Sequence, residues 1–207
     1  MIYHVPYIVR KALPQMVWRY TAERSIYLTF DDGPIPEVTP YVLDTLAAYG
    51  AKATFFCVGD NVRKYPKLYQ RILQEGHSVG NHTYHHKNGW KTQTEQYMAD
   101  VDKAAKVIDS RYFRPPYGKL RPAQLKKLRE EYTVVMWDVL SGDYDPSRTA
   151  DQCLQTVTAH STPGSVVVFH DSLKAADTLR EILPKVLHHC KENGWDMAAI
   201  EQADHQF

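Results

Sequence analysis

The stretch SIYLTFDDGP, residues 25–34, ends an apolar run with two adjacent aspartates and a Gly-Pro pair. The run 25–30 is typical of a buried strand. Side chains of adjacent strand residues point to opposite faces, so Asp31 and Asp32 can take different roles where the strand becomes a loop. One carboxylate can bind a metal ion while the other stays free as a general base. The alternative interpretation is a β-turn with a capping aspartate.

Outward from this stretch, short strand patterns alternate with longer helical patterns. Strands are predicted at 25–30, 53–58, 77–82, from 112, and at 133–139, 165–170 and 195–200. Helices are predicted at 39–50, 65–76, 92–110, 121–131, 147–160 and 174–190. About seven strands that alternate with helices predict an α/β fold with a parallel sheet covered by helices. A closed or partly closed barrel and an open doubly wound sheet both satisfy this pattern.

Length and composition narrow the class of protein. The 207 residues suit a single domain, residues 1–207, and 43% hydrophobic residues can fill a sizeable core. The formal net charge of +1 gives no basic excess, so we expect no nucleic-acid partner. No window approaches the roughly 18 apolar residues of a membrane span, so we expect none. Cys57, Cys153 and Cys190 form no CxxC pair and are interpreted as buried thiols.

The N-terminal sequence does not resemble a signal peptide. Its apolar stretches are short and are interrupted by His4, Pro6, Arg10 and Lys11, so it lacks the apolar core that export signals require. Taken as the natural start, this terminus predicts a cytoplasmic protein. A trimmed terminus would instead allow an extracytoplasmic one.

Ionisable residues recur where the predicted strands end. In parallel α/β sheets, the chemistry gathers at the carboxyl ends of the strands. We therefore expect one rim of the sheet to carry Asp31, Asp32, His82, Arg114, Asp138, Asp143, His170 and Asp171.

The stretch HTYHH, residues 82–86, offers histidines at metal-ligand spacing. His82 and His86 are spaced i,i+4 and would share one face of a helical turn, while His82 and His85 would serve nearly as well by spacing. Two histidines with a carboxylate from Asp31 or Asp32 form a recurrent catalytic zinc set with an open position for water. The alternative is a surface histidine cluster.

The stretch FRPPYG, residues 113–118, predicts a rigid loop, because two prolines fix the backbone. Arg114 could hold a carboxylate in place, and the Tyr117 amide could contribute to an oxyanion hole. The alternative is an ordinary Pro-rich turn with a surface arginine.

The stretch VVVFHD, residues 166–171, places His170 at the end of a predicted strand. Asp143, in SGDYDP at 141–146, could orient this histidine and raise its pKa, as a general acid requires. The alternative is a structural histidine.

Together these motifs resemble the polysaccharide deacetylase family, the NodB-homology domain of a carbohydrate esterase family, over residues 25–200 or thereabouts. TFDDGP at 29–34, HTYHH, RPPYG and the pair Val168 and His170 follow one another in the family's order. The resemblance implies one catalytic domain with a distorted (β/α)7 barrel, in which parallel strands are surrounded by helices.

The resemblance also implies roles for residues of these motifs. Asp31 would be the general base, and Asp32, His82 and His86 would bind one divalent metal ion, with His85 a bystander. The metal implied is Zn²⁺, with Co²⁺, Mn²⁺ or Ni²⁺ as alternatives.

Further roles follow from the third motif of the family. Arg114 would orient Asp31. The Tyr117 amide, next to Pro116, would help to hold the oxyanion that forms when water attacks.

The resemblance also implies a general acid. His170 would be the general acid, tuned by Asp143. Tyr144 stands where the family usually has Trp, and Val168 stands where it commonly has Leu. Both changes would alter the wall of the acetyl pocket.

The activity implied is metal-dependent removal of N-acetyl groups from an amino sugar, with release of acetate. The substrate would be an oligo- or polysaccharide of the chitooligosaccharide or peptidoglycan type, so the expected partner is an N-acetylated carbohydrate. Three alternatives stay open: a carbohydrate O-acetyl esterase, a hydrolase of unrelated amides, and a catalytically silent carbohydrate-binding domain.

Overall fold

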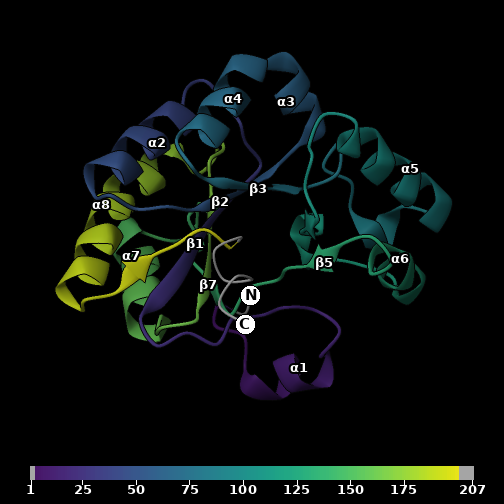
Figure 1. Cartoon of the computed structure of the whole chain (residues 1–207). Helices are drawn as coiled ribbons and strands as arrows, with labels where there is room; N and C mark the ends of the chain where they lie inside the picture. The colour runs from purple at the N-terminus through teal and green to yellow at the C-terminus, as the bar shows by residue number, and fades with distance from the viewer. Residues whose placement is uncertain (1–2, 201–207) are drawn as a thin grey trace.

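The computed structural model describes residues 3–200. Its centre is a parallel sheet that curls into a half-barrel (Figure 1). Across the described residues the sheet order is β5 (Thr133–Val134), β4 (Tyr112–Phe113), β3 (Ser78–Asn81), β2 (Thr54–Cys57), β1 (Ser25–Asp31), β7 (Val166–His170) and β6 (Val139–Leu140). A further strand, β8 (Asp196–Met197), pairs with the beginning of β1. The expected α/β class, a distorted barrel of parallel strands, is confirmed in this open form.

Helices flank the sheet as the sequence predicts. The expected helices are present with shifted ends: α2 (Thr39–Ala48), α4 (Pro66–Gln74), α5 (Thr94–Ala105), α6 (Pro122–Leu128), α7 (Ala150–His160) and α8 (Ala176–Glu192). The sequence patterns do not predict α1 (Tyr7–Ala12), α3 (Gly59–Lys64) or the short 3-10 turns η1 (Gly89–Lys91) and η2 (Pro116–Gly118). None of the helices within residues 3–200 combines the length and the apolar character that crossing a membrane requires.

The prediction of one strand at 133–139 is wrong, because two strands occupy this stretch. β5 and β6 follow each other in the chain but lie at opposite edges of the sheet. Between them, the carbonyl oxygens of Val135 and Met136 accept hydrogen bonds from the buried Arg114 side chain. These oxygens are satisfied by a side chain instead of a neighbouring strand. The backbone therefore leaves the sheet here, and a gap opens in the barrel.

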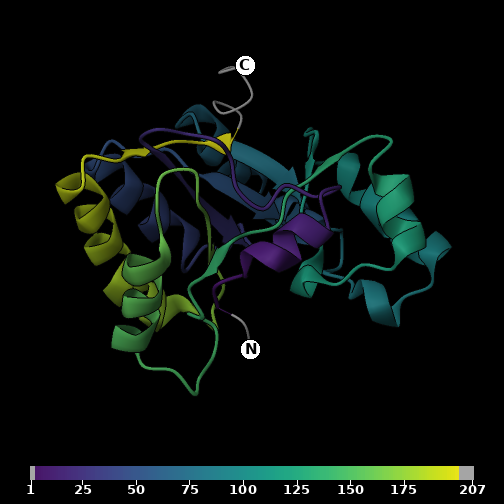
Figure 2. The same ribbon diagram turned by 90° about the horizontal axis from the view of Figure 1, so that it is seen from below.

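The N-terminal segment covers this gap. His4 and Val17 form β-bridges with Val139 and Val135, on the two sides of the gap. The helix α1 lies between these two bridges in the chain. Figure 2 shows it between the α7 side and the α6 side of the molecule.

The alternation along β1 separates an outer core from a barrel interior. Ile26, Leu28 and Phe30 belong to the largest hydrophobic cluster, which includes side chains of α2, α4, α7 and α8. Tyr27 belongs to a second cluster inside the curl. Asp31 shares the parity of Tyr27 and therefore faces the interior, at the carboxyl end of the strand. The three cysteines are free and buried, as expected.

Asp138 does not lie on the rim, so its predicted position is wrong. It precedes β6, so it lies at the amino end of that strand. Its carboxylate accepts hydrogen bonds from the Val166 amide (2.9 Å) and the Ser165 hydroxyl (3.0 Å). It also lies 3.4 Å from the Arg19 guanidinium. Asp138 therefore fastens the N-terminal segment to the end of the sheet opposite the predicted site.

Replacing Asp138 with Ala should destabilise the fold. The change leaves a buried amide and a hydroxyl without an acceptor, at an expected cost of about 2–4 kcal/mol in the free energy of unfolding. Urea unfolding followed by circular dichroism measures this cost. The exposed Asp102→Ala on α5 is the matched control and should stay within about 0.5 kcal/mol of the parent chain. Equal losses in the two variants would contradict the fastening role.

Candidate active site

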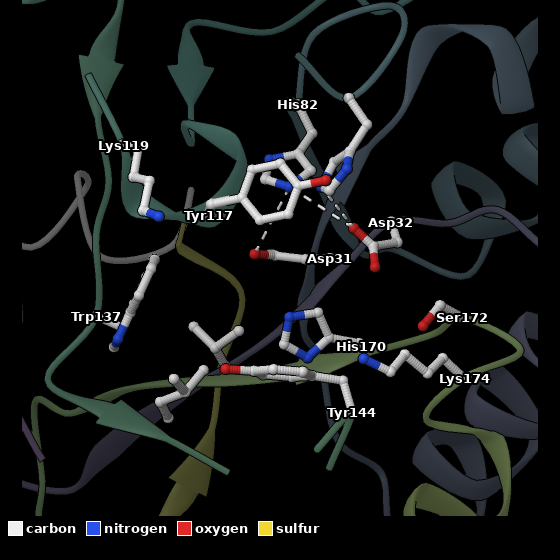
Figure 3. Close-up of a pocket in the computed structure, with 13 residues that line it drawn as sticks. Asp31, Asp32, His82, Tyr117, Lys119, Trp137, Tyr144, His170, Ser172 and Lys174 are labelled. Carbon is white, nitrogen blue, oxygen red and sulfur yellow. Dashed lines mark ion pairs between the residues drawn. The ribbon is translucent and has the colours of Figure 1, made fainter. Parts of the chain in front are cut away.

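A cavity of about 660 Å³ opens at the carboxyl ends of the central strands (Figure 3). The sequence-predicted residues that line it are Asp31, Asp32, His82, His86, Tyr117, Tyr144, Val168 and His170. Three other predicted residues, Arg114, Pro116 and Asp143, are buried behind this lining. The structure thus brings the predicted residues together, while their roles stay predictions.

Arg114 determines how Asp31 is oriented. The Arg114 side chain is fully buried, and its Nη1 donates to Asp31 Oδ1 at 2.8 Å and to the Thr29 hydroxyl at 2.7 Å. Its guanidinium also lies 4.0 Å from the centre of the Phe56 ring. Burial lowers the pKa of Arg114, and the neighbouring Asp31 carboxylate opposes that shift. With Oδ1 held in this way, Asp31 Oδ2 faces His82 Nε2 across 3.9 Å.

Asp32, His82 and His86 bring three ligand atoms together. Asp32 Oδ1 lies 3.1 Å from His86 Nε2 and 3.8 Å from His82 Nε2. One ligand atom from each residue lies within 4.8 Å of the other two. Asp32 Oδ1 is buried and makes no well-formed hydrogen bond to any described residue. A buried acceptor in this position needs a partner, and two imidazole nitrogens with one carboxylate oxygen suit a divalent metal ion.

The protonation state of His82 also suits a metal ligand. Its Nδ1 donates to the Arg114 carbonyl oxygen at 2.7 Å, which leaves the lone pair of Nε2 facing Asp32. Burial lowers the pKa of His82 to about 4, so the imidazole is neutral near pH 7. Burial alone would raise the pKa of Asp32, but the surrounding histidines, His86 first, hold it well below its usual range.

The HTYHH segment forms an irregular loop, so the expected helical turn is wrong. Thr83 and His86 both have positive φ, at 62° and 53°. Asp100 on α5 holds the loop, because its Oδ2 accepts two backbone amides, including that of His85 at 2.9 Å. The His85 ring turns to the same carboxylate, with Nδ1 2.5 Å from Oδ1. His86, rather than His85, is therefore the histidine that faces the cavity with His82.

His170 and Asp143 form a second titratable pair. Asp143 Oδ1 lies 2.8 Å from His170 Nδ1, and Oδ2 accepts the His170 backbone amide at 2.8 Å. Burial lowers the pKa of His170, but the Asp143 carboxylate outweighs this effect and raises the value to about 9. His170 is therefore protonated near pH 7. The Tyr144 ring packs edge-on against it, with ring centroids 4.6 Å apart.

Tyr117 covers His86, with ring centroids 4.7 Å apart. It adopts a φ of 62° inside η2, where Pro116 is buried. The Gly118 amide donates to the Pro115 carbonyl oxygen at 3.0 Å and holds the turn. No described residue accepts a hydrogen bond from the Tyr117 amide, so this donor is available to a ligand.

Asp171 holds the DDGP loop from within the protein. Its fully buried carboxylate accepts the Gly33 amide at 2.9 Å and the Thr39 hydroxyl at 2.6 Å. Its own amide donates to the Asp31 carbonyl oxygen at 3.1 Å. A Cβ atom on Gly33 would lie 2.0 Å from Asp171 Oδ2, so only glycine fits at this position. Burial raises the pKa of the Asp171 carboxyl to about 8.

Five residues of the cavity lining were not predicted from the sequence. These residues are Lys119, Trp137, Leu140, Ser172 and Lys174. Lys119, Ser172 and Lys174 lie just after the RPPYG and VVVFHD motifs, and this closeness is the signal that could have found them. Trp137 and Leu140 lie in or beside the stretch where the expected strand is broken, so strand alternation could not have placed them.

Comparisons with known proteins show the family of the chain. The family described as polysaccharide deacetylase matches residues 19–137. The chain is similar to a peptidoglycan-N-acetylglucosamine deacetylase of Bacillus cereus, with 36% identity over 174 residues that cover 78% of this chain and 63% of that protein. It is also similar to a chitooligosaccharide deacetylase of Azorhizobium caulinodans, with 32% identity over 72% of this chain and 74% of that protein.

A solved structure extends the similarity to the fold. The chain resembles the crystal structure of the Bc1960 peptidoglycan N-acetylglucosamine deacetylase, with a TM-score of 0.83 and 31% identity. The alignment covers 91% of this chain and 92% of the other. The chain thus spans less than two thirds of the Bacillus cereus relative above and nearly all of the chain in this solved structure.

Removing one residue of the Asp32, His82 and His86 cluster should prevent metal binding. We expect the parent chain to bind about one equivalent of Zn²⁺. Asp32→Ala and His82→Ala should each bind Zn²⁺ at least about 100-fold more weakly, because each change removes a predicted ligand. Equilibrium dialysis with metal analysis measures both affinities. His85→Ala, outside the cavity, is the matched control and should bind like the parent. If Asp32→Ala also bound like the parent, the ion would have to lie elsewhere.

Proposed function

Because the chain belongs to the polysaccharide deacetylase family, we propose that it is a metal-dependent hydrolase that removes N-acetyl groups from amino sugars in a glycan. The glycan is of the peptidoglycan or chitooligosaccharide type, the substrates that name its relatives. One observation carries the proposal: Asp31 and His170, a carboxylate and a protonated imidazole, share one cavity with the Asp32, His82 and His86 cluster.

The metal ligands in this proposal are Asp32, His82 and His86. The ion is Zn²⁺, since two histidines with one carboxylate form a recurrent zinc set, and Co²⁺, Mn²⁺ and Ni²⁺ are alternatives that the same donor atoms accept. When bound, the ion supplies Lewis acidity that polarises the acetamide carbonyl and acidifies water.

Asp31 acts as the general base. Arg114 holds its Oδ1, so Oδ2 is the oxygen that faces the cavity. As water attacks the acetyl carbon, the new C–O bond forms and the water proton passes to this oxygen. The Tyr117 amide, which has no acceptor among the described residues, donates a hydrogen bond to the oxygen that gains charge.

His170 acts as the general acid. Asp143 keeps its ring protonated and oriented. As the C–N bond breaks, the ring transfers its proton to the departing amine, and the products are acetate and a free amino sugar. The two groups therefore move protons in opposite directions, as a hydrolysis needs.

The wall of the cavity suits the acetyl methyl group. Val168 on β7 and Leu140 on β6 line it with apolar side chains, and Trp137 and Tyr144 add aromatic surface. Tyr144 stands where the family usually has Trp, which adds a hydroxyl to this wall. We propose that the methyl group packs here while the sugar ring stays at the mouth of the cavity.

The protonated state of His170 favours an amide substrate over an ester. The same base and cluster could also hydrolyse a carbohydrate O-acetyl ester, but an alcohol leaves more readily than an amine and needs less help from a general acid. A silent carbohydrate-binding domain would not need the base, the acid and the metal ligands in one cavity. The cytoplasmic location expected from the sequence stays a prediction, and it bears on which glycans the protein meets.

Acetate release from defined glycans tests the proposal. The zinc-loaded chain should release acetate from tetra-N-acetylchitotetraose or from a peptidoglycan tetrasaccharide. A chelator should stop the reaction, and added Zn²⁺ should restore it. Asp31→Asn should keep the metal but lose about 10²- to 10⁴-fold in kcat, because an amide cannot take the water proton. Enzymatic acetate assay measures the rates.

The controls separate the parts of this proposal. Asp102→Asn, an exposed aspartate on α5, should leave kcat unchanged. No acetate from any N-acetylated glycan, with metal bound, would refute the deacetylase function. Near-parental turnover by Asp31→Asn would refute its role as base, and faster release from an O-acetylated glycan would point to the esterase.

The pH dependence of Asp143→Asn tests the acid. A general acid works while it is protonated, so activity is present below the pKa of His170 and is lost as pH rises through about 9. Without the Asp143 carboxylate, only the charges of Asp32 and Asp31 still oppose burial, so the pKa of His170 falls below about 9. The alkaline limb of kcat against pH should therefore move to lower pH, and turnover should fall more at pH 8 than at pH 6. A limb that stays in place would exclude His170 as the group that Asp143 tunes.

A further inference from the structure

Two lysines at the cavity carry charges that the proposed deacetylation does not use. Lys119 follows η2 and Lys174 precedes α8, and both line the cavity. Figure 3 shows them on opposite sides of it, with Asp31 and His170 between them. The catalytic groups thus lie between two positive charges.

Neither ammonium group is neutralised by the part of the chain that the structure describes. No residue within 3–200 forms an ion pair or a hydrogen bond with Nζ of Lys119 or Lys174. Each lies instead beside an aromatic ring. Lys119 Nζ is 5.0 Å from the centre of the Trp90 ring, and Lys174 Nζ is 5.5 Å from that of Tyr144. The two rings attract the ammonium groups and help to position the lysine side chains, but they do not neutralise the charges.

The carboxylates of the cavity are engaged elsewhere. Asp31 is paired with Arg114, and Asp32 faces His82 and His86. The two lysines therefore present uncompensated charge to a ligand. Unpaired cations at the mouth of a cavity attract ligands that bring anionic groups, and a glycan built only of N-acetylglucosamine brings none.

We propose that Lys119 and Lys174 bind carboxylates on the sugars that flank the acetylated sugar, so that the preferred substrate is an acidic glycan. This inference rests on the proposed deacetylase function. A chain that alternates N-acetylglucosamine with N-acetylmuramic acid has the required pattern, because each neutral sugar stands between two sugars that carry a lactyl carboxylate. With the neutral sugar at Asp31 and His170, one lysine lies on each side for its two neighbours (Figure 3).

Equilibrium binding measures this recognition separately from turnover. The zinc-loaded Asp31→Asn variant is titrated calorimetrically with an alternating tetrasaccharide of N-acetylglucosamine and N-acetylmuramic acid. The second ligand is the same tetrasaccharide with its carboxyl groups reduced to alcohols. We expect the acidic form to bind about tenfold more tightly at low salt. The preference should shrink in about 0.5 M NaCl, because salt screens exposed charges.

Lysine variants made in the Asp31→Asn chain assign the preference to its source. Lys119→Gln and Lys174→Gln should each reduce it about three- to fivefold, and the double variant should remove it. Arginine at both positions should retain it, because guanidinium also binds carboxylate. Lys126→Gln is the matched control, exposed on α6 and outside the cavity lining, and should leave the preference unchanged.

Two results would overturn the inference. One is equal binding of the acidic and the reduced tetrasaccharides, and the other is a preference that survives in the double glutamine variant. The preference for the acidic over the reduced tetrasaccharide is a binding result, so it tests the role of the lysines whether or not the parent chain releases acetate. Acetate release by the parent chain, in turn, tests the proposed function alone.

Discussion

The buried guanidinium of Arg114 is the group on which both the sheet and the site depend. It donates to the backbone oxygens of Val135 and Met136 and to the Asp31 carboxylate. The backbone bonds take the place of a strand ladder and open the barrel, while the carboxylate bond orients the proposed base. A cation without solvent contact needs such partners, because its desolvation costs several kcal/mol or more. One side chain thereby couples the gap in the barrel to the position of Asp31.

The same constraint makes the N-terminal segment part of the barrel. Once the chain leaves the sheet after β5, its backbone groups need new partners. Val17 supplies them, since its amide donates to the Val134 oxygen at 2.9 Å and its oxygen accepts from the Met136 amide at 2.7 Å. Asp138 then ties Arg19 to the start of β7. The gap between β5 and β6 is thus bridged by the segment of chain that precedes β1.

The sequence predicts the site best where the signal is local. The strand that ends in Asp31 and Asp32 reads directly from its apolar run, and the alternation of strands and helices predicts a parallel sheet with one active rim. The fold of the HTYHH loop cannot be predicted from its local sequence, because it depends on Asp100 from a later helix. Asp138 was misplaced for a similar reason: Arg114, a distant residue in the chain, breaks the strand that would have carried it to the rim. Long-range hydrogen bonds to buried side chains leave no periodic trace in a sequence.

The different roles proposed for His82 and His170 follow from one difference in their surroundings. Burial lowers the pKa of both His82 and His170. His82 donates its Nδ1 proton to a carbonyl oxygen, which carries no net charge, so burial prevails and the ring is neutral. His170 is held by the Asp143 carboxylate, whose charge outweighs burial and keeps the ring protonated. A neutral ring can offer a lone pair to a metal ion, and a charged ring can give up a proton. The partner of Nδ1 therefore decides which of the two tasks each histidine can perform.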